Sequence, residues 1–140
     1  MKKFAWLLGL ILLIGCTVNN DQPAVETNIN WMHDIVLAKE AAKSEDKPIL
    51  IDFYTEWCGW CKRLDKDTYS NTEVQKKLSD FICVKIDAEQ NIDLAKEYKI
   101  NGFPSTAFLE SDGKLIEVIP GYMPPDDFLK ILDQMLQKAG

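Results

Sequence analysis

Hydrophobic and polar residues follow one another along this chain in patterns that predict strands and helices in alternation. Residues 49–54 form a nearly continuous apolar run, which is typical of a central strand covered on both faces. A second strand is expected at residues 81–86. Residues 106–109 and 115–119 flank the turn-forming Ser-Asp-Gly at 111–113, a pattern that predicts an antiparallel hairpin.

Helical patterns lie before and between these strands. Asn30 is a suitable N-cap for a first helix, whose apolar side chains recur at helical spacing: Trp31, Ile35, Ala38 and Ala42. A second helix is expected over residues 59–68. Ser70 and Glu73 then resemble a capping box that opens a third helix, which ends near Leu78.

Two further helical patterns complete the chain. The first is short and is indicated by three apolar residues and a closing turn: Ile92, Ala95, Tyr98, Asn101 and Gly102. The second is amphipathic and begins with prolines and acids at residues 124–127. The order of elements is (β)αβαβαββα, in which the βαβ connections require parallel strands and the hairpin antiparallel ones. We therefore predict one α/β domain with a mixed central sheet flanked by helices.

The N-terminus has the pattern of a targeting segment. Lys2 and Lys3 precede residues 4–14, which are apolar apart from a glycine and are too short for the roughly 20 residues that a membrane-spanning helix needs. Residues 1–15 are therefore interpreted as a signal peptide. Residues 16–29 are mostly polar and predict a flexible tether. Residues 30–140 remain as the folded domain.

Composition and charge narrow the class of function. The 140-residue chain has 46% hydrophobic and 27% charged residues, as expected of a globular protein with a single core. Its formal net charge is −6, which argues against a protein that binds nucleic acid through phosphate contacts. Four cysteines are too few for a disulfide-stapled scaffold but suffice for a redox or metal site.

The strongest chemical signal is Trp-Cys-Gly-Trp-Cys-Lys at residues 57–62, directly after the expected central strand and at the start of a helix. The first turn of a helix stabilises an anion, so we expect a lowered thiol pKa at Cys58 and assign it as the attacking thiolate. Cys61 lies one turn later on the same face, close enough to form a disulfide with Cys58 and to resolve a mixed disulfide.

Two alternatives use the same pair of cysteines. One is a zinc or copper site, but only Cys83 and His33 remain as soft ligands, and neither has a helpful spacing. The other is an inert structural disulfide. We assign no metal site, and we interpret His33 as a surface residue.

Three segments together resemble the thioredoxin superfamily: residues 51–62, residues 84–87, and Gly-Phe-Pro-Ser-Thr at 102–106. The similarity is greatest to the extracytoplasmic branch that is tethered to membranes, and it covers the chain from about Asn30 onward. It implies a thioredoxin fold. It also implies a cis peptide bond at Pro104, beside the active disulfide, with Phe103 pairing with the substrate backbone.

Asp52 is a lone acid in the apolar run, six positions before Cys58. A buried carboxyl holds its proton more tightly than an exposed one, so Asp52 is suited to accept a proton from Cys61 when that thiol attacks. The resemblance implies the same role. The alternative is a side chain that reaches water at the end of the strand.

Several positions depart from the family pattern. Cys83 stands where thioredoxins usually have a lysine near the aspartate, and Lys85 lies two residues further on with the same side-chain direction. Cys83 is interpreted as a small core residue, with a third redox thiol as the alternative. Lys66 replaces a helix-kinking proline, so that helix is expected to be straighter or to end near Thr68.

The residues around Cys58 predict a shallow apolar surface suited to extended substrate segments: Trp57, Trp60, Phe103, Gly121 and Tyr122. The alternative is that Phe103 and Tyr122 only pack against neighbouring residues and do not bind substrate. The Leu-Ile-Gly-Cys sequence at residues 13–16 resembles the lipobox of bacterial lipoproteins, which implies cleavage before Cys16 and its acylation. The alternative is a secreted soluble protein.

These observations predict a thiol–disulfide oxidoreductase, with no cofactor, that exchanges the Cys58–Cys61 dithiol or disulfide with extracytoplasmic partner proteins. A lipid anchor at Cys16 holds it to a bacterial membrane, on the periplasmic side in a Gram-negative cell. The reductase direction is favoured, and it requires a membrane-borne electron donor as a further partner. The alternative is a thioredoxin-fold module that binds copper or zinc through the same two cysteines.

Overall fold

The computed structural model describes residues 27–140, so the expected signal peptide and Cys16 lie outside the described residues. The elements follow in the order α1 (Ile35–Glu45), β1 (Ile49–Tyr54), α2 (Gly59–Leu64), the π-helical turn η1 (Asp65–Tyr69), α3 (Thr72–Leu78), β2 (Ile82–Asp87), α4 (Ile92–Glu97), β3 (Ser105–Leu109), β4 (Leu115–Pro120) and α5 (Pro125–Ala139). None of the helices within residues 27–140 has the length and apolar character needed to cross a membrane.

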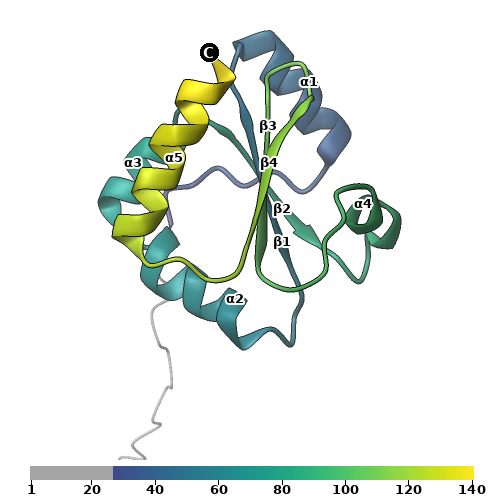
Figure 1. Ribbon diagram of the computed structural model, residues 1–140, viewed down its shortest axis with the longest axis vertical. Helices are drawn as coiled ribbons and strands as arrows, with labels where there is room; N and C mark the ends of the chain where they lie inside the picture. The colour runs from purple at the N-terminus through teal and green to yellow at the C-terminus, as the bar shows by residue number, and fades with distance from the viewer. Residues whose placement is uncertain (1–26) are drawn as a thin grey trace, which may run out of the picture.

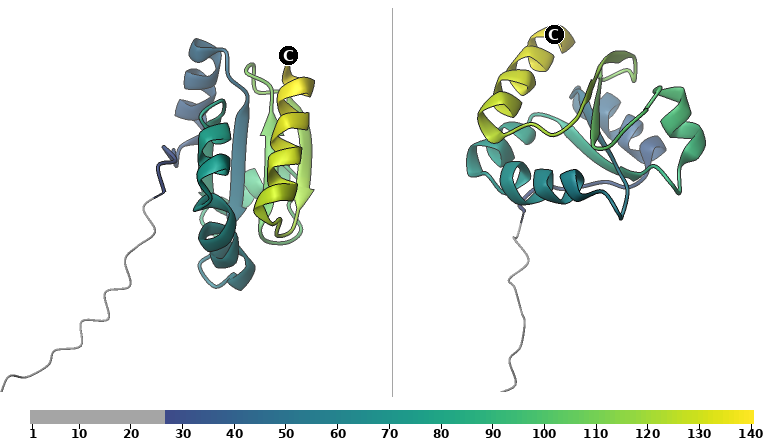
Figure 2. Two further views of the ribbon diagram at one scale, coloured as in Figure 1. Left: turned by 90° about the vertical axis from the view of Figure 1, so that its left-hand side faces the viewer. Right: turned by 60° about the horizontal axis from the view of Figure 1, so that its bottom comes forward.

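The strands form one mixed sheet in the order β2-β1-β3-β4. β1 pairs in parallel with β2, whereas β3 pairs antiparallel with both β1 and β4. Helices cover both faces of this sheet, with α1 and α4 on one side and α2, α3 and α5 on the other (Figures 1 and 2). The predicted mixed α/β architecture and its β3–β4 hairpin are confirmed.

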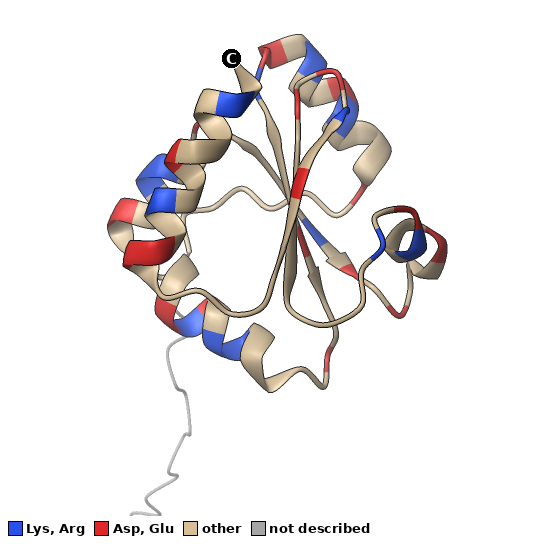
Figure 3. Cartoon of the chain, viewed as in Figure 1, with Lys and Arg blue, Asp and Glu red and all other residues tan. Residues whose placement is uncertain are grey.

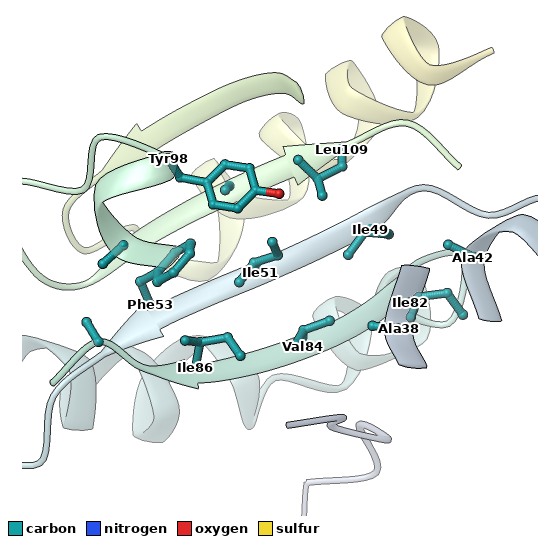
Figure 4. Packing of buried hydrophobic residues seen from close by; sticks show 13 residues of the cluster. Ala38, Ala42, Ile49, Ile51, Phe53, Ile82, Val84, Ile86, Tyr98 and Leu109 are labelled. Carbon is teal, nitrogen blue, oxygen red and sulfur yellow. The ribbon is translucent and has the colours of Figure 1, made fainter. Parts of the chain in front are cut away.

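Alternation along β1 divides the core into two layers. Ile49, Ile51 and Phe53 belong to the cluster under α1 and α4, and the labelled side chains of Figure 4 show how they pack there. Leu50 points to the opposite face and packs with residues of α2, α3 and α5. Asp52 shares the parity of Leu50, so the strand directs this carboxyl toward α2 and η1.

The expected start of the first helix is wrong. α1 begins at Ile35, where the carboxylate of Asp34 accepts hydrogen bonds from the N–H groups of Val36 (2.8 Å) and Leu37 (3.1 Å). Residues before it are extended, and Met32 forms a parallel bridge with Val84 of β2. The pairing with β2 draws this segment into the edge of the sheet, which overrides its helical spacing.

Two helix ends also differ from the predictions. Asn71, and not Ser70, caps α3, because its side-chain oxygen accepts from the N–H groups of Glu73 (3.0 Å) and Val74 (3.1 Å). The sequence predicts that Asn101 and Gly102 close the turn after α4, whereas the left-handed residue there is Lys99, with a φ of 54°.

The helix that begins at Gly59 continues to Tyr69, one residue beyond the expected end, but its second half is the π-helical turn η1. Lys66, at the position of the missing proline, lies within η1. The wider π turn brings Thr68 and Tyr69 into the core, where each is at most 1% exposed.

Candidate active site

One edge of the sheet collects the residues that the sequence singled out. Because β1, β2 and β4 run in the same direction and β3 runs against them, the segments after β1, β2 and β4 and before β3 meet there. This edge lies at the lower end of the sheet in Figure 1, next to the start of α2. Cys58 follows β1, and Pro104 precedes β3.

Cys58 and Cys61 are joined in a disulfide at the start of α2. Cys58 is the N-cap residue, and its Sγ accepts a hydrogen bond from the N–H of Cys61 (3.1 Å). The two cysteines are similarly buried, with 5% and 4% exposed surface. What distinguishes them is position, because only the Cys58 sulfur lies at the cap, where a helix offers unpaired N–H groups to an anion.

Asp52 is 1% exposed on β1, and its neighbour in the β1–β2 register is Lys85. The Lys85 Nζ lies 3.4 Å from Oδ2 of Asp52, whereas Oδ1 has no hydrogen-bond partner. Burial raises the pKa of Asp52 to about 6, and the nearby positive charge of Lys85 limits that rise. Lys85 thus stands beside Asp52, as its side-chain direction indicated, and the alternative of a solvated aspartate is wrong.

Lys85 joins this buried carboxyl to the surface. Its Nζ also contacts the carboxylate of Asp65 on η1 and lies 5.2 Å from the ring of Trp31, 5.3 Å from Tyr69 and 5.5 Å from Tyr54. A hollow of about 440 Å³ reaches this group and is lined by Trp31, Tyr69, Lys85, Asp65, Thr27, Lys62 and Lys66. Water therefore has access to Lys85, which is the ion-pair partner of Asp52.

The expected apolar surface lies around the disulfide. Trp57 is 67% exposed and Trp60 55% exposed. The ring of Trp57 meets Phe103 edge-on at 6.1 Å, and the ring of Trp60 lies 5.5 Å from Tyr122.

The loop before β3 completes this surface. The Phe103–Pro104 peptide bond is cis, as the resemblance predicts. A hydrogen bond joins Pro104 to the neighbouring loop: the carbonyl oxygen of Pro104 accepts from the N–H of Gly121 (2.8 Å). Gly121 has a φ of 93°, which a residue with a side chain adopts only at a cost.

Three charged residues around the tryptophans were missed from the sequence. Glu89 accepts a hydrogen bond from the indole N–H of Trp57 (2.7 Å). Arg63 places its guanidinium 5.4 Å from the ring of Trp60, and its Nε donates to Asp67 (3.1 Å). The hydrogen bond from Arg63 lowers the pKa of Asp67. The spacing of Arg63 and Asp67, four residues apart on a helix, was the available signal, whereas nothing local pointed to Glu89.

The two remaining candidates for metal ligands lie apart from the disulfide chemistry. Cys83 is 4% exposed, its thiol donates to the carbonyl of Leu78 (3.6 Å), and burial raises its pKa to about 12. It has the environment of a core residue. His33 is exposed, with Nδ1 3.1 Å from the carbonyl oxygen of Lys85. Within residues 27–140, no group of three His, Cys, Asp or Glu side chains is arranged to hold a metal ion.

Comparisons with known proteins agree on one family. The protein-family model described as the thioredoxin-like domain matches residues 36–136. The thiol:disulfide interchange protein DsbD of Vibrio cholerae is 32% identical over 114 residues, which are 77% of this chain and 19% of that protein. DsbD of Actinobacillus pleuropneumoniae is 29% identical over 105 residues, 71% of this chain and 18% of that protein. The chain thus spans about a fifth of the length of these curated relatives.

Solved structures give the same result. The oxidised C-terminal domain of Neisseria meningitidis DsbD superposes with a TM-score of 0.61 at 29% identity, covering 74% of this chain and 97% of that domain. A thioredoxin from Thermus thermophilus has a TM-score of 0.71 at 23% identity and covers 79% of this chain and 88% of its own. The second match is evidence for the fold alone.

Proposed function

The chain belongs to the thioredoxin-like domain family, whose relatives include thiol:disulfide interchange proteins, and from this premise we propose that it exchanges its Cys58–Cys61 pair with disulfides of partner proteins. One observation carries the proposal. The disulfide lies at the first turn of α2, on a sheet edge bordered by exposed Trp57 and Trp60.

The exchange proceeds in two steps in the reducing direction. The Cys58 thiolate attacks one sulfur of the partner disulfide, so that a Cys58–partner bond forms and the partner S–S bond breaks. The released partner sulfur takes up a proton. The Cys61 thiolate then attacks the Sγ of Cys58, which closes the intramolecular disulfide and releases the second partner sulfur. Two electrons and two protons pass to the partner, and the Cys58–Cys61 pair is oxidised.

Asp52 handles one of these protons. Its carboxyl is nearly fully buried, and its pKa of about 6 lets it gain or lose a proton near neutral pH. In this role Asp52 takes the proton of Cys61 as that thiol becomes the attacking thiolate. The hollow beside Lys85 provides the route by which the proton reaches water. Lys85 holds the carboxylate in place and is a positioning residue.

Substrate binding falls to the apolar surface. Trp57 and Trp60 offer exposed aromatic area, Phe103 is half-buried against Trp57, and Pro104 shapes the loop that follows Phe103. An extended segment of the partner lies across this surface, with its disulfide against Cys58.

The wider setting follows from the N-terminal sequence. Residues 1–15 act as a signal peptide, Cys16 carries the lipid anchor, residues 16–29 form the tether, and residues 30–140 form the catalytic domain. The protein then works outside the cytoplasm on a bacterial membrane, on the periplasmic side in a Gram-negative cell. In the reductase direction, a membrane-borne dithiol donor returns two electrons to the Cys58–Cys61 disulfide after each exchange.

The test is reduction of a synthetic peptide with one disulfide by the prereduced protein. Wild type is expected to reduce the peptide and to end as the Cys58–Cys61 disulfide. Cys58→Ser is expected to lose the reaction, whereas Cys83→Ala serves as the matched control and retains it, because Cys83 is buried away from the surface. Full activity of Cys58→Ser would overturn the proposal. A reduction potential above that of the glutathione couple would overturn the reductase direction alone.

A further inference from the structure

The apolar surface around Cys58 is flanked by opposite charges. The strand order β2-β1-β3-β4 places the segment after β2 and the segment after β4 at opposite ends of the active-site edge. Glu89 belongs to the first segment and Tyr122 to the second, whereas Cys58 follows the interior strand β1. The two tryptophans divide accordingly, since Trp57 contacts Glu89 and Trp60 contacts Tyr122.

The Trp57 end is acidic. The indole N–H of Trp57 donates a hydrogen bond to Oε1 of Glu89 (2.7 Å). The carboxylate is exposed, and its second oxygen, Oε2, does not take part in this bond. The carboxylate of Asp87 accepts a hydrogen bond from the backbone N–H of Glu89 (2.9 Å), so a second acid belongs to the same turn. Exposed Glu56 adds a third acid. The pKa of Tyr54 is raised first by burial and then by the negative charges of Asp87 and Glu56.

The Trp60 end is basic. The guanidinium of Arg63 lies 5.4 Å from the ring of Trp60 and 5.5 Å from the ring of Tyr122. One acid also lies at this end, because Asp67 accepts from Nε of Arg63 (3.1 Å) and from the hydroxyl of Tyr122 (3.2 Å). The guanidinium has four further N–H groups that a partner can engage. A hollow of about 270 Å³ is lined by Gly59, Trp60 and Arg63, directly beside the N-cap position of Cys58.

Figure 3 shows where the charged residues lie along the backbone. Basic residues mark α2 and acidic residues mark the loop before α2 and the end of β2, whereas α4 and η1 carry both signs. The described surface around Cys58 thus has an apolar centre, with the guanidinium of Arg63 beside Trp60 and the carboxylate of Glu89 beside Trp57. Charge complementarity of this kind chiefly raises association rates and selects the orientation of a partner.

We propose that the partner is an extended, disulfide-bearing protein segment with charges of opposite sign on the two sides of its reactive cysteine. Its carboxylate contacts Arg63 beside Trp60, and its ammonium or guanidinium contacts Glu89 beside Trp57. The inference rests on the proposed exchange at Cys58 and adds the class of substrate that the site selects.

The experiment uses peptides with one cysteine held in a disulfide with an uncharged small thiol. One peptide carries Glu before and Lys after the cysteine, a second carries the reverse order, and a third carries Gln at both places. The prereduced protein releases both thiols from each peptide and is itself oxidised to the disulfide. Exposed ion pairs contribute about 0.2–1 kcal/mol each, so the two charged peptides are expected to differ about fivefold in kcat/KM.

The double charge reversal Arg63→Glu with Glu89→Lys is expected to invert the ranking of the two charged peptides. The matched control reverses a distant pair, Lys77→Glu with Asp133→Lys, whose ion pair of 2.7 Å joins α3 to α5, and it keeps the wild-type ranking. If the double reversal at the site does not fold, the single changes Arg63→Gln and Glu89→Gln are each expected to reduce the preference.

The outcomes separate the two proposals. Equal kcat/KM for the three peptides, or a ranking that survives the charge reversal at the site, overturns the inference and leaves the exchange chemistry standing. Failure of the prereduced wild type to reduce any of the peptides overturns the exchange at Cys58 itself. A preference that shrinks with added salt, as screening of exposed charges requires, supports the inference.

Discussion

Replacing Asp52 by asparagine is expected to make the protein more stable at neutral pH while impairing its chemistry. Burial raises the pKa of Asp52 from 3.8 to about 6, so the folded state binds this proton more tightly than the unfolded chain does. The stability that accompanies the protonated carboxyl is therefore present below about pH 4 and is lost as pH rises through 6. At 1.36 kcal/mol per pKa unit, the loss amounts to about 3 kcal/mol.

Asp52→Asn cannot ionise and does not suffer this loss. Lys85 keeps its contact with Asp65, so the substitution does not leave the ammonium without a carboxylate. The free energy of unfolding in urea, measured on the oxidised protein from pH 3.5 to 8, is expected to coincide for variant and wild type at the acid end. Above pH 6 the variant is expected to be more stable by about 3 kcal/mol.

The matched control is Glu40→Gln, which removes an exposed carboxylate from α1 and is expected to show no comparable pH-dependent gain. A variant no more stable than wild type at pH 7.5 would show that ionised Asp52 does not destabilise the fold, and so would a gain of equal size at every pH. In the peptide assay, the same variant is expected to resolve mixed disulfides more slowly near neutral pH, because Cys61 then lacks its proton acceptor.

Three further predictions concern the surroundings of the site. Lys85→Met is expected to raise the pKa of Asp52 further, because the positive charge of Lys85 lowers this pKa in the wild type. NMR titration of the Asp52 carboxyl measures the change. The Cys83 thiol, with a pKa of about 12, is expected to resist alkylation in the folded protein and to react after unfolding. Mass spectrometry of the alkylated protein measures the difference. Thr68→Val is expected to cost about 1–3 kcal/mol in urea unfolding, because its hydroxyl donates to the buried carbonyl of Met123 (2.6 Å).

Local patterns were sufficient to predict the parts of the fold in which one physical effect dominates. The apolar run of β1 matches a strand buried on both faces, and its alternation correctly directs Asp52 toward α2. The same apolar run ends at Tyr54, so it also placed Cys58 and Cys61 directly after the central strand. Lys85 could be placed beside Asp52 because residues of equal parity on neighbouring strands share a face.

The errors arose where segments distant in sequence compete with local preference. The segment at Trp31 has helical spacing, but Met32 pairs with β2 and the ring of Trp31 packs against Tyr69 at a centroid distance of 5.0 Å. The contacts of Glu89 with Trp57, 32 positions apart, have no local signature either. Such contacts depend on which loops the strand order brings together, and hydropathy does not encode them.

Attack by Cys58 on a partner disulfide is tested by trapping the first step with Cys61→Ser. Prereduced variant is mixed with a disulfide-bonded peptide, and the adduct is mapped by mass spectrometry after proteolysis. A stable mixed disulfide is expected between the peptide and Cys58, and none with Cys58→Ser under the same conditions. An adduct that forms on Cys61 in Cys58→Ser as readily as on Cys58 in Cys61→Ser would show that Cys58 is not the attacking thiolate.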